Sequence, residues 1–263
     1  MNIKAVVSNV IICVFCLTAV VLTGTGNCIA QERAGVDLAN LEPNLPLRVV
    51  DAVPIPSGAR QIQAAVRYQD PDEGKKEFYF QPRIAAGIAP NLQVAADVPY
   101  IDNSDEKGSG DIGLEALYRF NTESGQLPSF ALMGRFEIPT GKESSGLDTV
   151  LKLIATKSFR SEALMQRAHL NLEWKRNSGR DQGERENLYA AVLGVDIPVN
   201  KSMLLVADIF REQQRKEGKY TNMFELGIRS QIRPDAVISL GGGIGLWDES
   251  PDWRVLLGFQ FSF

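Results

Sequence analysis

Cysteine and histidine are almost absent from the sequence. Its 263 residues include 1 histidine and 3 cysteines, and the cysteines, Cys13, Cys16 and Cys28, all lie near the start. The rest of the chain therefore cannot form a disulfide framework, a thiolate metal site or a cysteine nucleophile. We expect neither a metal site nor a cofactor.

The sequence also lacks an excess of positive charge. The chain carries 28 Lys and Arg against 32 Asp and Glu, and its formal net charge is −4. A nucleic-acid partner requires a basic face. The acidic balance therefore argues against nucleic-acid binding.

Long apolar runs are confined to the start of the chain. Lys4 precedes an apolar stretch from Val10 to Leu22, and small residues follow up to Ala30. This pattern predicts a secretory signal peptide over 1–30, cleaved after Ala30. The apolar run ends before Thr23, short of the roughly twenty residues that a membrane helix needs.

Beyond residue 30, apolar and polar residues alternate along most of the chain, and no apolar run is long enough for a membrane helix. The clearest case is the end of the chain, where Phe259, Phe261 and Phe263 alternate with polar or small residues. Such a strand suits a wall with lipid on one side and a polar interior on the other. An amphipathic edge strand of a soluble sandwich is the alternative interpretation.

The alternation predicts an all-β protein, a closed antiparallel transmembrane β-barrel of about twelve strands over 59–263; ten or fourteen strands remain alternatives. The expected strands are 59–69, 77–88, 92–101, 110–120, 129–139, 148–159, 166–176, 186–197, 203–212, 220–232, 236–246 and 253–263. Short turns alternate with longer, charged loops, as in outer-membrane barrels, so we expect both chain ends on the periplasmic side. The register is uncertain from Met203 to Phe210, where the alternation falters.

The segment 31–58 differs from the barrel because it contains Pro43, Pro46, Pro54 and Pro56, which block regular strand pairing. We predict an extended arm that lies in the periplasm or partly in the lumen. A disordered linker is the alternative.

Aromatic residues near the strand ends predict two girdles at the membrane surfaces, with outer-membrane lipid as the partner. On the outer side these residues are Phe78, Phe80, Tyr100, Trp174, Tyr189 and Phe224, and on the periplasmic side Tyr118, Phe120, Phe130, Phe159, Phe261 and Phe263.

Ionisable residues on the opposite strand face predict a charged lumen, because they would be costly against lipid. The candidates are Arg67, Arg83, Asp97, Glu115, Arg119, Arg135, Glu137, Lys152, His169, Glu173, Asp208, Glu225 and Arg229.

Two segments carry a family resemblance. Gly108-Ser109-Gly110-Asp111-Ile112-Gly113 and Phe136-Glu137-Ile138-Pro139-Thr140-Gly141-Lys142 resemble the paired GxGD and PTG segments of the outer-membrane barrel family named for the meta pathway of phenol degradation. The resemblance covers roughly 62–263 and implies a transporter or porin-like barrel; it identifies no catalytic residues. The terminal Phe263 resembles the signal that outer-membrane barrels present to the barrel assembly machinery, which implies that machinery as a partner.

Two tempting sites have simpler interpretations. The glycine-rich stretch 241–245 is not followed by a helix pattern, so we interpret it as small residues on a crowded barrel wall rather than a nucleotide loop. His169 and Asn171 are expected on one lumen-facing side. With a serine in place of Asn171, this pair would resemble the catalytic His and Ser of lipid-cleaving outer-membrane barrels. Without that serine we expect His169 to be a hydrogen-bonded lumen residue or a pH-sensitive partner of Glu173.

The sequence thus predicts a porin-like transporter barrel in the bacterial outer membrane. It would allow passive passage of small solutes, including hydrophobic or aromatic ones, through a charged lumen, and it would not be an enzyme. Two alternatives stay open: an outer-membrane lipid hydrolase, and a closed structural or surface-binding barrel. The sequence does not identify the solute.

Overall fold

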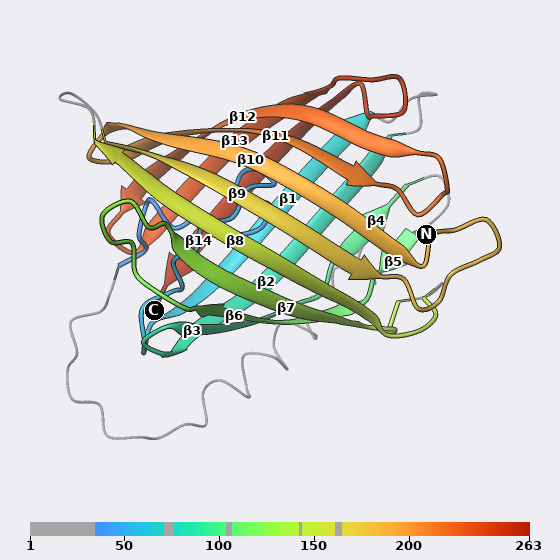
Figure 1. The fold of residues 1–263 in the computed structure, drawn as a ribbon, viewed down its shortest axis with the longest axis horizontal. Helices are drawn as coiled ribbons and strands as arrows, with labels where there is room; N and C mark the ends of the chain where they lie inside the picture. Colours follow the sequence, from blue (N-terminus) through green and yellow to red (C-terminus); the bar gives the residue numbers. More distant parts are fainter. Residues whose placement is uncertain (1–34, 71–75, 104–106, 142–143, 161–164) are drawn as a thin grey trace, which may run out of the picture. The chain divides into compact units, whose positions relative to one another are not determined.

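The computed structural model describes residues 35–70, 76–103, 107–141, 144–160 and 165–263 (Figure 1). The predicted leader over 1–30, with the three cysteines, and residues 31–34 lie outside the described residues. The described residues all belong to one compact unit, Ala34–Phe263.

The regular structure of the described residues is β-strand. The strands are β1 (Arg60–Asp70), β2 (Glu77–Ala89), β3 (Leu92–Asp97), β4 (Tyr100–Asp102), β5 (Lys107–Ser109), β6 (Ile112–Arg119), β7 (Ser129–Ile138), β8 (Asp148–Arg160), β9 (Met165–Arg176), β10 (Asn187–Asn200), β11 (Met203–Gln213), β12 (Tyr220–Arg233), β13 (Ala236–Gly245) and β14 (Trp253–Ser262). The described part of the chain contains no helix that could span a bilayer.

The strands form a closed antiparallel ring. Neighbours in sequence pair from β6 through to β14, and β1 pairs with both β14 and β2, which closes the sheet. β3 and β4 both pair with β2, one after the other along its length. On their other side β3 pairs with β6 and β4 with β5. β3 with β4, and β5 with β6, therefore each count as one interrupted strand, and the ring has twelve strands. The predicted twelve-stranded barrel is confirmed, and the soluble sandwich is wrong.

The interruptions correct one predicted strand and one predicted loop. The segment 92–101 was expected to be continuous, but β3 ends at Asp97 and β4 begins at Tyr100. Pro99 lies in the gap and has no N–H to donate, while its carbonyl accepts the N–H of Gly110 at 2.8 Å. The next predicted strand, 110–120, corresponds to β6 alone, and β5 lies just before it in residues that were expected to belong to a loop.

Burial alternates along the strands with a period of two residues. In β14, Arg254, Leu256 and Gln260 are buried, whereas the intervening Val255 and Leu257 are exposed. The exposed side chains of the other strands are also mostly large and apolar. A closed wall of paired strands with an apolar outer face is the form in which a sheet can cross a bilayer.

Two sets of connections define the two ends of the barrel. The turn end carries the short connections after β2, β6, β8, β10 and β12, and the loop end carries those after β1, β4, β7, β9, β11 and β13. β1 starts and β14 finishes at the turn end, so residue 58 and Phe263 both lie there.

Candidate functional site

The inner face of the barrel carries the charged residues that the sequence analysis assigned to the lumen. Those that are buried are Arg83, Asp97, Glu115, Lys152, His169, Asp208, Glu225 and Arg229. Those that are partly buried are Arg67, Arg119, Arg135, Glu137 and Glu173. Much of this burial comes from the segment that precedes β1.

Residues 35–58, called the arm below, lie inside the ring of strands, as the blue segment of Figure 1 shows. The sequence left the placement of this segment open. Its apolar side chains meet apolar side chains of the inner wall: Leu41, Leu47 and Val49 pack with Val206 and others, and Val50 and Ala52 pack with Ile154 and others. The arm thus has a core of its own with the wall.

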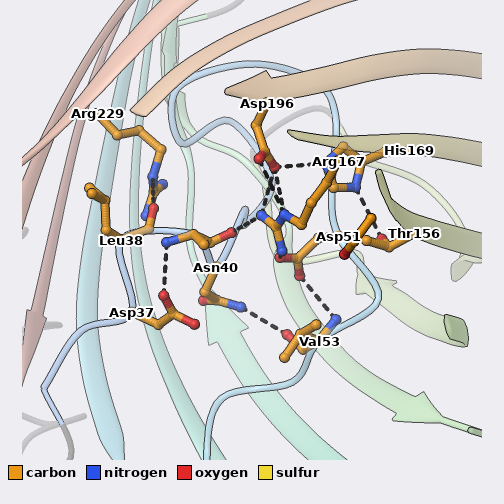
Figure 2. A network of polar contacts seen from close by, with 12 residues as sticks. Asp37, Leu38, Asn40, Asp51, Val53, Thr156, Arg167, His169, Asp196 and Arg229 are labelled. Atoms are coloured by element: carbon orange, nitrogen blue, oxygen red, sulfur yellow. Dashed lines mark hydrogen bonds and ion pairs between the residues drawn. The ribbon is translucent and has the colours of Figure 1, made fainter. Parts of the chain in front are cut away.

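Wall arginines hold the first limb of the arm, residues 35–47. Arg229 donates from Nε to the carbonyl of Leu38 at 2.9 Å (Figure 2). It also donates from Nη1 to the carbonyl of Leu45 at 2.6 Å. Arg167 donates to the carbonyl of Ala39. Arg83 pairs with the carboxylate of Glu42 at 2.6 Å.

Wall acceptors hold the second limb of the arm, residues 48–58, through its backbone N–H groups. The N–H of Val49 donates to Asp208 at 2.8 Å, and that of Val50 to Asn171 at 2.9 Å. In the same way the N–H groups of residues 48, 52 and 55 reach Glu225, Thr156 and Gln93. Because these acceptors lie on β12, β11, β9, β8 and β3, the limb follows the inner wall from strand to strand. Buried N–H groups without such partners would be costly.

Inner-face glycines provide the space in which the arm lies. A Cβ on Gly194 would come within 2.6 Å of the Val49 side chain, and one on Gly258 within 2.6 Å of Leu45. Gly227 and Gly241, which face each other across β12 and β13, are likewise covered by Pro46 and Leu47. The predicted crowding around 241–245 is therefore present, and at Gly241 the arm is its cause.

His169 lies in a structural network. Its Nε2 is 2.8 Å from Asp196 Oδ2, and its Nδ1 is 3.0 Å from Thr156 Oγ1 (Figure 2). Of the two expected roles, a hydrogen-bonded lumen residue and a partner of Glu173, the contacts of His169 fit the first. Glu173 contacts Lys152 and Arg48 instead. Asn171, in the place of the missing serine, donates to the carbonyl of Val50. The histidine thus supports the wall next to the arm.

Charged side chains nearer the loop end form what we call the outer vestibule, consisting of Arg48, Glu137, Glu173, Lys175 and Glu212. Arg48 reaches up from the arm to Glu173 at 3.2 Å and to Glu212 at 2.9 Å. Glu212 and Glu173 raise the pKa of Arg48, which therefore keeps its charge. Side chains of this group retain between 15% and 29% of their exposure, so water reaches them.

The aromatic residues expected at the membrane surfaces lie on the outer face. Phe78, Tyr118, Phe120, Phe159, Tyr189, Phe224 and Phe263 are exposed. Phe80, Tyr100, Phe130, Trp174 and Phe261 are partly exposed. Their level relative to a membrane surface stays a prediction.

The two family segments meet at the loop end. Asp111 Oδ1 accepts the N–H groups of Thr140 and Gly141 at 3.2 and 3.0 Å, and its Oδ2 accepts the hydroxyl of Ser144 at 2.7 Å. A Cβ on Gly113 would overlap the guanidinium of Arg135, which pairs with Asp97. The motif therefore forms a clasp between two loops; Lys142 lies outside the described residues.

Sequence reasoning missed several residues that hold the arm. Arg167 alternates in phase with His169 and pairs with Asp51 and Asp196, so strand parity could have found it. Thr156 and Gln93 are uncharged, and a search for ionisable side chains passes over them; Asn171 was expected on the lumen-facing side, but not as a partner of the arm. Among the described residues, no group of three or more His, Asp or Glu side chains could hold a metal ion.

Solved outer-membrane barrels have the same fold. A KdgM porin in complex with disordered oligogalacturonate superimposes with a TM-score of 0.55 at 13% identity over 77% of this chain and 99% of that chain. The NanC porin gives a TM-score of 0.54 at 11% identity over 78% and 100%. Omp33 of Acinetobacter baumannii gives 0.52 at 9% identity over 78% and 97%. At these identities the likeness concerns the fold alone.

The sequence comparisons point to one family. No curated protein matches the sequence. A family model, described as the MetA-pathway of phenol degradation, matches residues 62–263, which is the barrel without the arm. The chain therefore belongs to this family of outer-membrane, porin-like β-barrels, as its GxGD and PTG segments had indicated.

Proposed function

We propose that this protein is a pore for small solutes in the bacterial outer membrane. The observation that carries the proposal is the outer vestibule, a group of charged and partly exposed side chains inside a wall whose outer face is apolar. The porin-like fold supports it. The description of the family supports small hydrophobic or aromatic compounds as solutes.

In the cell, export through the leader 1–30 would deliver the chain to the outer membrane. The C-terminal strand, ending in Phe263, would be recognised there by the barrel assembly machinery. The turn end would then face the periplasm and the outer vestibule the exterior. The chemistry that we assign to the lumen is passage without catalysis, since His169 is used to support the wall.

The arm has to move for passage to occur, because its apolar side chains fill the lumen below the vestibule. Of its two limbs, the second continues directly into β1 and stays attached there. The first limb begins beside the turn end, where the N–H of Val36 donates to the carbonyl of Pro234 at 3.1 Å. We therefore expect the first limb to leave toward the periplasm.

A disulfide lock tests the proposal. A Cβ on Gly258 would lie 2.6 Å from Leu45 Cδ2, so the side chains of Leu45→Cys and Gly258→Cys would face each other, and the pair is a candidate for a disulfide. The native cysteines all precede residue 31, so the pair would be the only thiols of the processed chain. In planar bilayers we expect current steps from the reduced protein and few from the oxidised protein. Solute uptake by cells should fall on deletion of the protein.

A closed structural or surface-binding barrel is the second candidate, and the filling of the lumen by the arm favours it. It predicts no current in either redox state and no change of uptake on deletion. That result would contradict the pore proposal.

A further inference from the structure

We propose that the wall beneath Leu45, Pro46 and Leu47 is a binding site for a small amphipathic carboxylate, and that the arm occupies this site in the closed protein. The inference rests on the proposed pore and specifies its solute. It starts from Arg229, whose environment differs from that of the other arginines that hold the first limb.

Arg229 is fully buried. Its guanidinium donates hydrogen bonds to the carbonyls of Leu38 and Leu45 and, at 2.6 Å, to the amide oxygen of Gln260. Within the part of the chain that the structure describes, no carboxylate lies within ion-pair distance of it. Asp37, Glu42 and Asp51 of the arm act on it only from beyond contact distance. A buried cation without a counter-charge in contact is costly, and neutral carbonyl oxygens compensate for it only in part.

The other two wall arginines that hold the first limb, Arg83 and Arg167, each also pair with a carboxylate of the wall. Arg83 contacts Glu115 at 2.5 Å, and Arg167 contacts Asp196 at 2.6 Å. If the first limb leaves, these two remain paired. Arg229 loses both carbonyls and becomes a cation that faces the lumen with only an amide beside it.

Further donors next to Arg229 lack partners. The Nε2 of Gln260 and the hydroxyl of Ser239 are buried and have no hydrogen-bond partner among the described residues. Ser239 faces Arg229 directly across β12 and β13. A guanidinium, an amide N–H group and a hydroxyl together form a set that suits the oxygens of a carboxylate.

The apolar part of the site is a patch of wall without side chains. Gly227 and Gly241 form a cross-strand pair, and Gly258 lies across from Ser239 on the next strand. The side chains of Leu45, Pro46 and Leu47 lie against these glycines. When they leave, a small apolar body can take their place while its carboxylate oxygens replace the carbonyl oxygens of Leu38 and Leu45.

The site and the arm therefore compete, and a competing ligand should release the arm. The reporter is Leu41→Cys, a buried position of the first limb outside the site, in a chain without other cysteines after residue 28. The rate at which a maleimide labels this cysteine in the intact protein measures the fraction of molecules in which the first limb has left the lumen. The probes are benzoate, benzyl alcohol and benzylamine, which share one apolar body and differ in charge.

We expect benzoate alone to accelerate labelling, by about tenfold at ten times its dissociation constant from the vacant site, because it binds only the protein whose site is vacant. Arg229→Gln should raise the basal labelling rate, since it removes the two contacts to the arm, and should abolish the benzoate effect. Arg233→Gln, in an exposed side chain near the end of the same strand, is the matched control and should change neither.

Three results would overturn the site: no acceleration by benzoate, equal acceleration by all three probes, or full labelling without any probe. The first two leave the pore intact if the disulfide lock still controls the current. If the reduced double-cysteine protein gave no current while benzoate still released the arm, the pore proposal would be wrong and the binding-site proposal would stand.

Discussion

A single methyl group on the inner wall should loosen the arm. In Gly194→Ala the new Cβ would come within 2.6 Å of Val49 Cγ2 and 2.9 Å of Val49 Cβ. Real Cβ contacts do not become this short, and the β-branched side chain of Val49 has little rotamer freedom with which to move away. Val49 must therefore shift together with its backbone, whose N–H donates to Asp208.

The magnitude follows from the cost of overpacking. Inserting a methyl group into a packed interior costs about 1–3 kcal/mol. Val49, at the start of the second limb, packs in one cluster with Leu41 and Leu47 of the first limb. If departure of the first limb lets Val49 move away from the wall and relieves the strain, the strain favours release by roughly 5- to 150-fold, since about 1.4 kcal/mol corresponds to a factor of ten. The wall itself, from β9 to β11, should keep its pairing.

The assay is maleimide labelling of Leu41→Cys in the two backgrounds. The matched control is Gly134→Ala, because a Cβ there would meet only Leu151 Cδ2 at an ordinary 3.8 Å. We expect faster labelling with Gly194→Ala and an unchanged rate with Gly134→Ala, while both barrels show the same heat-dependent gel mobility. Equal labelling rates in the two variants would refute the reasoning.

Three further changes test the clasp, the lipid face and the histidine. Asp111→Ala removes acceptors from two backbone N–H groups and should lower the free energy of unfolding in urea by about 1–3 kcal/mol, with Asp111→Asn losing less. Leu153→Arg, midway along β8 on the outer face, should cost about 2–4 kcal/mol in lipid vesicles, and Leu153→Ala much less. His169→Ala removes hydrogen bonds that support the wall next to the arm, so labelling of Leu41→Cys should rise while any lipid hydrolysis of the preparation stays unchanged. Loss of hydrolysis would instead support the lipid-hydrolase alternative.

Most strand positions could be read from the sequence because a barrel wall imposes one simple rule. Each strand has lipid on one side and the lumen on the other, so its residues alternate, and loops interrupt the pattern at regular intervals. β14 shows this directly, with Phe259 outside and Gln260 inside. The break at Pro99 was not predicted, because proline is also tolerated within a strand at positions that need no N–H, as Pro82 in β2 shows.

The location of the arm could not be read in this way. Its hold on the wall comes from backbone N–H and C=O groups, which every sequence has, bound to wall side chains more than thirty positions away in the chain. Prolines such as Pro46 exclude regular pairing but do not distinguish a segment inside the lumen from one outside it. Only the partners on the wall make that distinction.

The wall nevertheless carries a trace of the arm in its sequence. From Met203 to Phe210 the alternation falters because Leu204 and Val206 face inward, and both belong to the apolar cluster that contains Leu41 and Val49. A strand that is apolar on both faces requires an apolar neighbour on each. In a membrane barrel, lipid supplies one neighbour, so a second must lie inside. Doubly apolar strands together with inward glycines are therefore a sequence signal for an occupied lumen, and the partner here is the segment just before the first strand.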